Sequence, residues 1–140
     1  MSRTLARERA FQLTYELEIQ QVPVAEQLDW HFTLEPCKNE DEEGYIRATV
    51  SGIFENLEEI DKQIESYSKN WKKNRIAKVD LAILRLAIYE ILYSKQVPDE
   101  VAINEAVELT KRYADNSASF VNGILSSVVQ GFKEKSDDGE

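Results

Sequence analysis

The sequence predicts an all-α protein of about six to seven helices, arranged as two small three-helix bundles within a single domain over residues 1–140. First, the 140 residues include only three prolines and five glycines, which disfavours a β-sandwich. Second, 42% of the residues are hydrophobic and 31% are charged, the profile of a folded, helix-rich chain. Third, apolar residues recur every three or four positions, and no segment alternates as a strand would.

The N-terminal half, about residues 3–66, is expected to hold the first helices. Residues 4–20 contain no Gly or Pro and carry apolar residues on one helical face. Pro23 fits the first turn of a short second helix. After an acidic segment over 35–43, a narrow apolar seam predicts one long bundle helix, with a dimeric coiled coil as the alternative. The seam consists of Ile46, Val50, Ile53, Leu57, Ile60 and Ile64.

The C-terminal half, about residues 75–131, follows a polar connection. Its first stretch, over about 76–92, is apolar almost all round, which predicts a central helix. Pro98 begins a further helix that ends near Tyr113. A last helix follows, and residues 133–140 are expected to form a disordered tail. Its candidate N-cap residues are Asp115, Asn116 and Ser117.

Charge is distributed unevenly along the chain. The net charge of −9, taken whole, argues against a nucleic-acid binder. However, three arginines lie within the first nine residues, and residues 66–85 hold six basic residues against Asp80 alone. The strongly acidic stretch over 16–65 separates these two basic pieces. Both basic pieces are candidates for binding phosphate, and whether they lie close together depends on the fold.

Motifs for catalysis and cofactor binding are absent from the sequence. Cys37 is the single cysteine and His31 the single histidine, which excludes a zinc finger. No Gly-rich phosphate loop occurs, and no apolar run is long enough for a membrane span or a signal peptide. We therefore expect a cytoplasmic interaction module with no cofactor and no small-molecule substrate. An enzyme using Cys37 and His31 is the alternative.

The segment over 115–123 is the strongest candidate for base recognition. It collects side chains that hydrogen-bond bases, and Phe120 could stack on one. The alternative is a capped helix start with Phe120 in the core.

Three stretches of the chain resemble the NusB family of transcription antitermination factors. They are ARERAFQLTYELE (6–18), RIAKVDLAILRLAIYEI (75–91) and VPDEVAINEAVELTKRYADNSASFVNGIL (97–125). The resemblance implies an all-helical fold of two bundles and a bacterial cytoplasmic RNA-binding protein. It implies that the chain pairs with NusE, a small-subunit ribosomal protein, and that the pair binds boxA RNA. The complex would help RNA polymerase read through terminators, notably in ribosomal RNA operons.

The resemblance also implies roles for single residues. Arg3 and Arg7 would contact phosphates, and Arg85 would lie near the RNA. Phe120 would stack on boxA, and Asn122 would hydrogen-bond to it. The implied RNA-binding residues are Arg3, Arg7, Arg85, Asn116, Ser117, Phe120 and Asn122.

The implied NusE surface involves three further positions. Tyr15 matches a tyrosine of the first helix, and Asp80 matches an acidic position that pairs with a basic NusE residue. Asp80 is expected to be an exposed charge. Leu84 is expected to be a nearby apolar contact or, equally, part of the core.

The chain departs from the family in having fewer basic residues. Ser119 stands where a basic residue is common, and the N-terminal segment is less basic than in Arg-rich members. Because each lost phosphate contact lowers affinity, we expect weak RNA binding by the protein alone, with NusE completing the RNA surface. The alternative is a protein-interaction module, or a homodimer, with little RNA binding of its own.

Overall fold

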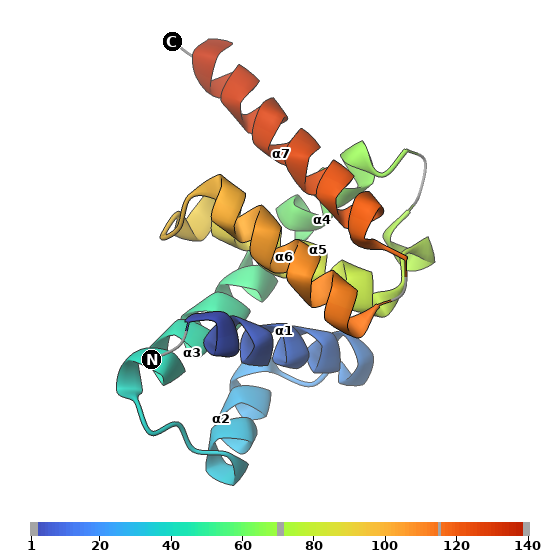
Figure 1. Ribbon diagram of the computed structural model, residues 1–140. Coiled ribbons are helices and arrows are strands. Elements are labelled where there is room, and N and C mark those ends of the chain that lie inside the picture. Colours follow the sequence, from blue (N-terminus) through green and yellow to red (C-terminus); the bar gives the residue numbers. More distant parts are fainter. Residues whose placement is uncertain (1–2, 70–71, 115, 139–140) are drawn as a thin grey trace.

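The computed structural model describes residues 3–69, 72–114 and 116–138, with side chains of the last helix described to Lys135. Within these residues seven α-helices and no strand occur, which confirms the all-α prediction (Figure 1). No helix of the described part is long and apolar enough to cross a membrane. The α-helices are α1 (Arg3–Gln20), α2 (Val24–Leu34), α3 (Glu40–Glu55), α4 (Leu57–Tyr67), α5 (Lys78–Tyr89), α6 (Asp99–Tyr113) and α7 (Ala118–Asp138). A short 3-10 turn (Lys73–Arg75) precedes α5, and a π-helical turn (Glu90–Ser94) continues it.

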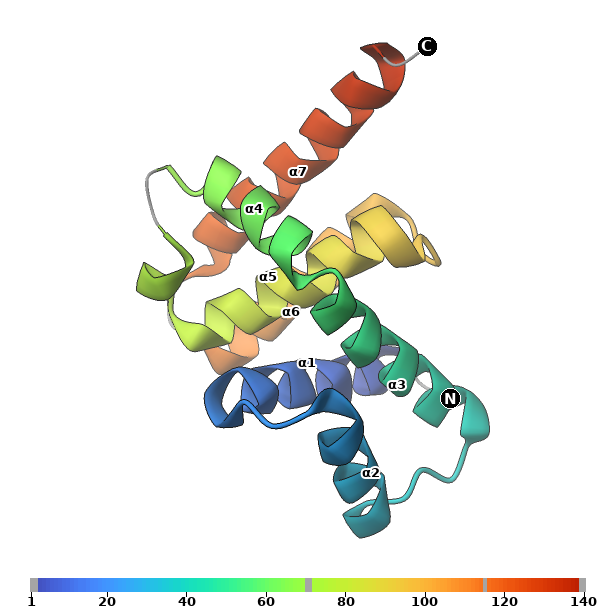
Figure 2. The ribbon, with the colours of Figure 1, turned by 180° about the vertical axis from the view of Figure 1, so that it is seen from behind.

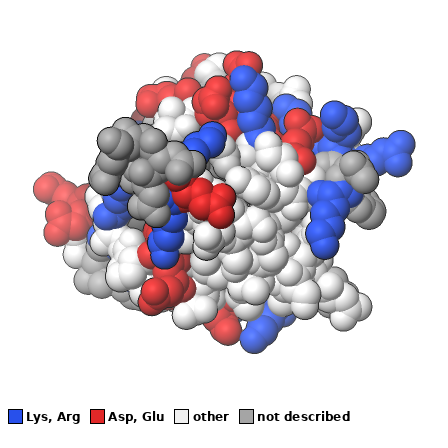
Figure 3. Space-filling model, turned by 90° about the horizontal axis from the view of Figure 1, so that it is seen from above, with Lys and Arg blue, Asp and Glu red and all other residues white. Residues whose placement is uncertain are grey.

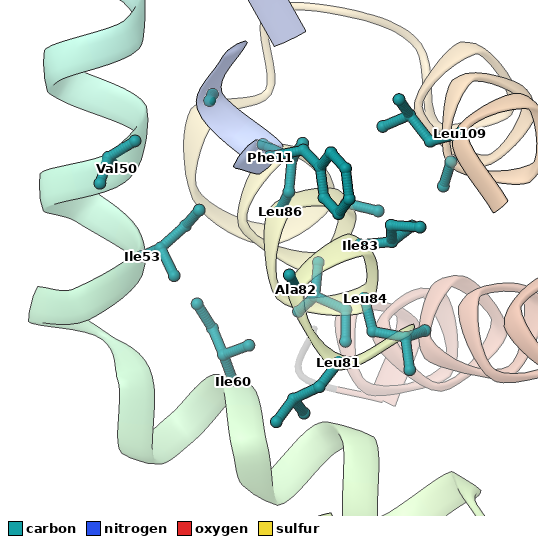
Figure 4. Close-up of a cluster of buried hydrophobic side chains, with 14 of the residues drawn as sticks. Phe11, Val50, Ile53, Ile60, Leu81, Ala82, Ile83, Leu84, Leu86 and Leu109 are labelled. Atoms are coloured by element: carbon teal, nitrogen blue, oxygen red, sulfur yellow. The ribbon is translucent and has the colours of Figure 1, made fainter. Parts of the chain in front are cut away.

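Helix α5 lies at the centre of the molecule. It packs against α1, α3, α4, α6 and α7, and Figures 1 and 2 show it surrounded in both views. Every residue from Asp80 to Ile88 is buried. A helix that is apolar all round can bury all of its side chains only when other helices surround it, as the sequence predicts. Figure 4 shows the buried side chains that gather around α5.

The predicted single helix over 46–64 is wrong, because the chain breaks at Asn56. The Asn56 side-chain amide donates to the Gly52 carbonyl at 2.8 Å, and its backbone N–H also points to Gly52 and Ile53. Such local side-chain bonds compete with the helix ladder. The break turns the chain, so that α4 packs on α5 and α7 (Figure 2). Thus α4, which the range 3–66 assigns to the N-terminal half, packs with the C-terminal helices.

The C-terminal segment is helical where a disordered tail was expected. Helix α7 runs from Ala118 to Asp138, and its far end projects from the body of the molecule (Figures 1 and 2). Residues 133–138 contain neither Gly nor Pro, so nothing in them stops a helix that begins upstream. Residues 139–140 lie outside the described part.

Candidate nucleic-acid interface

A hollow of about 360 Å³ lies where α5 and α7 begin. Asp80 comes from the first turn of α5, while Asn116, Ser117 and Phe120 come from the start of α7. The fold therefore brings the predicted site residue Asp80 to three others, Asn116, Ser117 and Phe120, which lie far from it in the sequence. Asn122 is exposed on α7 but does not line this hollow. We call the hollow at the start of α5 and α7 the Asp80 hollow; it is lined by Arg75, Ile76, Ala77, Asp80, Asn116, Ser117 and Phe120.

Local backbone geometry sets the entrance to α7. Asn116 has a φ of 64°, in the left-handed region that Asn tolerates better than most residues. The Ser117 carbonyl then accepts the Val121 N–H at 3.0 Å, the first bond of the helix. Asp115, another candidate cap, lies outside the described residues. The Asn116 turn leaves its side chain exposed at the rim of the hollow.

Asp80 is buried, which corrects the expectation of an exposed charge. Its exposed fraction is 5%, and burial raises the pKa of its carboxyl, while a hydrogen bond from the Ser117 side chain opposes the shift. The Oδ1 atom has no hydrogen-bond partner among the described residues. An unpaired buried oxygen is costly, so Asp80 is a ready acceptor for any donor that enters the hollow.

Phe120 separates the Asp80 hollow from a second one of about 270 Å³. Its ring is half-buried and packs against the core, so the core interpretation holds in part, while stacking of the exposed part of the ring stays a prediction. The second hollow lies between α4 and α7. We call it the Tyr67 hollow; it is lined by Tyr67, Ser68, Lys69, Ser119, Phe120, Gly123, Ile124 and Ser127.

The predicted phosphate contacts of Arg7 and Arg85 are corrected by the structure. Arg7 is 3% exposed and donates two hydrogen bonds, of 2.7 and 2.9 Å, to the Glu90 carboxylate. Arg85 is 1% exposed and donates two hydrogen bonds, of 2.9 and 3.0 Å, to the Asp61 carboxylate. Buried guanidinium groups need paired carboxylates, and here those pairs tie helices together. Neither side chain is available to a phosphate.

Arg3 lies at the other end of α1, away from the hollows beside Phe120. Its guanidinium carbon is 4.1 Å from the centre of the Tyr45 ring, a cation–π contact. Arg3 and Tyr45 line a separate hollow with Tyr89. The structure therefore does not unite Arg3 with the Phe120 motif.

The expected partner residues differ in accessibility. Leu84 is fully buried, which confirms the core position expected as its alternative and rules out the partner contact (Figure 4). Tyr15 is half-buried on α1 and packs against the core. One turn later, Glu18 reaches Lys78 at 3.7 Å and Arg85 at 3.3 Å. Tyr15 therefore lies on the part of α1 that leads to the start of α5.

Cations that were not among the predicted RNA-binding residues lie beside both hollows. Lys69 lines the Tyr67 hollow, Arg75 lines the Asp80 hollow, and Lys72 lies between them in the chain; all three are exposed. Figure 3 shows Lys and Arg gathered at the right edge, where Figure 1 places the α4–α5 connection. The sequence signal for them is the basic stretch over 66–85, of which Lys69 and Arg75, but not the buried Arg85, lie beside Phe120.

Cys37 and His31 are held by Arg9. Its guanidinium donates to the Cys37 sulfur at 3.0 Å and lies 2.7 Å from His31 Nε2. Burial, followed by the nearby Arg9 charge, lowers the pKa of His31. Among the described residues, no group of three His, Cys, Asp or Glu side chains could hold a metal ion. The Arg9 contacts link α1 to α2 and to the segment that follows it.

A model of the NusB family matches residues 4–130. The transcription antitermination protein NusB of Acetivibrio thermocellus is 53% identical over 132 residues, covering 93% of this chain and 90% of the relative. Its counterpart in Clostridium perfringens strain SM101 is 44% identical, covering 95% of this chain and 100% of the relative.

Solved structures agree with this match. The structure of T. maritima NusB aligns with a TM-score of 0.85 at 36% identity, covering 93% of this chain and 92% of that chain. A crystal structure of the antitermination factors NusB and NusE in complex with dsRNA aligns with a TM-score of 0.83 at 29% identity, covering 94% and 99%. The chain therefore belongs to the NusB family of transcription antitermination proteins and is not an enzyme.

Proposed function

We propose that this antitermination factor pairs with the ribosomal protein NusE and binds the boxA element of nascent transcripts, notably those of ribosomal RNA operons. The pair would act in the bacterial cytoplasm on the RNA polymerase complex, which then reads through terminators. The observation that carries this proposal is the Asp80 hollow, which joins Asn116, Ser117 and Phe120 beside exposed cations. A solved neighbour described as NusB and NusE with dsRNA supports both partners.

The RNA side of the interface combines an aromatic ring with amides. The part of the Phe120 ring that is not buried in the core can stack on an unpaired base. The exposed amides of Asn116 and Asn122 can donate to and accept from base edges. Single-stranded RNA exposes both its base faces and its base edges, so it suits this combination better than a duplex does.

The protein partner would approach the same hollow. The free oxygen of Asp80 can accept a hydrogen bond from a basic NusE side chain, but only from one that enters the hollow. Tyr15, on the neighbouring part of α1, would extend the contact. Because Asp80 bonds to Ser117, partner and RNA would meet at adjoining residues. We therefore expect NusE to strengthen RNA binding by a chain whose net charge is −9.

The test is fluorescence anisotropy of a labelled boxA RNA, titrated with the protein alone and with its cognate NusE at two salt concentrations. We expect weak binding by the protein alone and tighter, sequence-selective binding with NusE. A scrambled RNA of the same length is the control. Absence of binding even with NusE would contradict the RNA role and leave the family assignment intact.

A second candidate is a homodimer or protein-interaction module with little RNA binding. It is favoured by exposed apolar side chains on α1 and α2, since Ile19, Trp30 and Leu34 are all more than half exposed. Sedimentation equilibrium of the protein alone tests this candidate. A monomer at all concentrations, together with RNA binding, would reject it.

A further inference from the structure

Most of the arginines that could bind RNA phosphates are already engaged in contacts within the protein. Arg7 and Arg85 are buried in ion pairs. Arg9 and Arg47 pair with carboxylates near α2, and Arg112 pairs with Glu8. Arg3 covers Tyr45. Arg75 is therefore the one arginine of the described residues that is exposed and engages neither a carboxylate nor a ring.

Lys69 and Lys72 share this condition. Both are exposed, and no described carboxylate lies within ion-pairing distance of either. Their neighbours Lys73 and Lys78 differ, because Lys73 pairs with Asp61 at 3.2 Å and Lys78 with Glu18 at 3.7 Å. Of the six basic residues over 66–85, three are thus exposed and unpaired, and we call them the connection cations (Lys69, Lys72 and Arg75).

Arg75 borders the Asp80 hollow and Lys69 the Tyr67 hollow, with Lys72 between them in the chain, and the two hollows share Phe120 as a wall. The Tyr67 hollow is open along α7, where Ser119, Gly123 and Ser127 follow at intervals of four residues. A Cβ added at Gly123 would meet no atom within 4 Å, so this wall leaves room for a ligand.

A second aromatic ring bounds the far side of the Tyr67 hollow. The Tyr67 hydroxyl lies directly against Gly131, where a Cβ would collide with it. Gly131 therefore allows the Tyr67 ring to pack closely on α7. Two aromatic side chains beside a basic rim suit single-stranded nucleic acid, whose bases stack on such rings.

We propose that the Asp80 and Tyr67 hollows form one path for single-stranded RNA across Phe120, and that the connection cations hold its phosphates. The proposal rests on the RNA-binding function proposed above and names where the backbone runs. Bases enter the two hollows on either side of Phe120. Lys69, Lys72 and Arg75 supply the sequence-independent share of the affinity, in place of Arg7 and Arg85.

The test compares two triple variants that remove equal charge. One carries Lys69→Gln, Lys72→Gln and Arg75→Gln; the control carries Lys38→Gln, Lys133→Gln and Lys135→Gln, at exposed positions outside both hollows. Each is titrated into labelled boxA RNA with cognate NusE over a series of salt concentrations. Each phosphate contact contributes about 0.7 to the slope of log affinity against log salt for single strands, so we expect the first variant to lose about 2 and the control almost nothing.

The other outcomes separate this inference from the proposed function. Equal slopes for both triple variants, with wild-type protein still binding RNA, would overturn the path and leave the RNA role standing. Weaker NusE binding by the first variant, measured without RNA and with RNA affinity unchanged, would assign the cations to the protein partner and also overturn it. Wild-type protein that binds no RNA would end both proposals. As a further arm, Arg75→Lys keeps the charge, and we expect it to keep the slope.

Discussion

At the scale of single residues, the buried carboxyl of Asp80 carries a cost in stability. Burial raises the pKa of its carboxyl, so the charged form is disfavoured in the folded protein. Its stabilising contribution is present below the unfolded pKa, near the ordinary value of 3.8, and is lost as pH rises through the folded pKa. The charged carboxylate at neutral pH therefore lowers the free energy of unfolding.

We predict that Asp80→Asn raises the free energy of unfolding near neutral pH, by on the order of 1 kcal/mol, while weakening NusE binding. The gain should vanish below the ordinary Asp pKa, because both proteins are then neutral at this site. Urea unfolding at neutral and acidic pH measures it. Glu100→Gln, at an exposed position in the first turn of α6, is the control and should give no gain. Loss of stability in Asp80→Asn at neutral pH would show that the charge is needed by the fold.

The half-buried ring of Phe120 allows its two possible roles to be separated. Phe120→Ala should cost about 1–2 kcal/mol of stability, less than the 3–5 kcal/mol typical of a fully buried ring, and should also weaken RNA binding. Phe120→Leu keeps apolar volume but removes the stacking face. We expect it to be nearly as stable as wild type, with RNA affinity about tenfold lower. Anisotropy and urea unfolding provide both measurements, and normal RNA affinity in Phe120→Leu would reject the stacking role.

The residue scale also shows what the sequence could not supply. The pattern places Asp80 and Arg85 as charges on an apolar helix, but it does not say whether such charges face solvent or pair inside. The partner of Arg85 is Asp61, on a helix 24 positions away, and the partner of Arg7 is Glu90, 83 positions away. Such pairings depend on tertiary packing, so both arginines read as free cations from the sequence.

At the scale of elements, periodicity predicts helices well and their breaks poorly. The central helix follows from its all-round apolar pattern, and Pro23 and Pro98 immediately precede α2 and α6. The break at Asn56 does not interrupt the apolar seam, because Ile53, Leu57 and Ile60 keep helical spacing across it. The helical end of α7 was missed for the opposite reason, since a charged segment without periodicity carries no burial signal.

Two glycines of α3 make a matched test of helix packing. A Cβ at Gly52 would collide with the Tyr89 ring on α5, whereas a Cβ at Gly44 would meet nothing within 4 Å. We predict that Gly52→Ala lowers the free energy of unfolding by about 1–3 kcal/mol through overpacking. Gly44→Ala should raise it by about 0.5–1 kcal/mol through better helix propensity. Urea unfolding of both variants checks this, and a stabilised Gly52→Ala would mean that Tyr89 moves aside freely.

At the scale of the whole molecule, the overall charge is a poor guide to binding. The chain is acidic in total, yet three exposed and unpaired cations, Lys69, Lys72 and Arg75, lie on the connection that leads to α5. Many other basic side chains form ion pairs that join helices distant in the sequence. The sequence shows the basic stretch over 66–85, but only the fold shows which of its charges are left for a ligand.

The Arg85 cluster ties together the two halves of the molecule, because its guanidinium on α5 reaches Asp61 on α4 and Glu18 on α1. We predict that Arg85→Met lowers the free energy of unfolding by about 3–5 kcal/mol, since it leaves the buried Asp61 carboxylate with only the exposed Lys73 as an ionic partner. Adding Asp61→Leu should recover most of that loss, because the buried carboxylate is then gone as well. Urea unfolding of the two single variants and the double variant measures the coupling. The folded double variant should bind boxA RNA with NusE as wild type does, because Arg85 acts within the fold; a large loss of RNA affinity in a stable double variant would return Arg85 to the RNA interface.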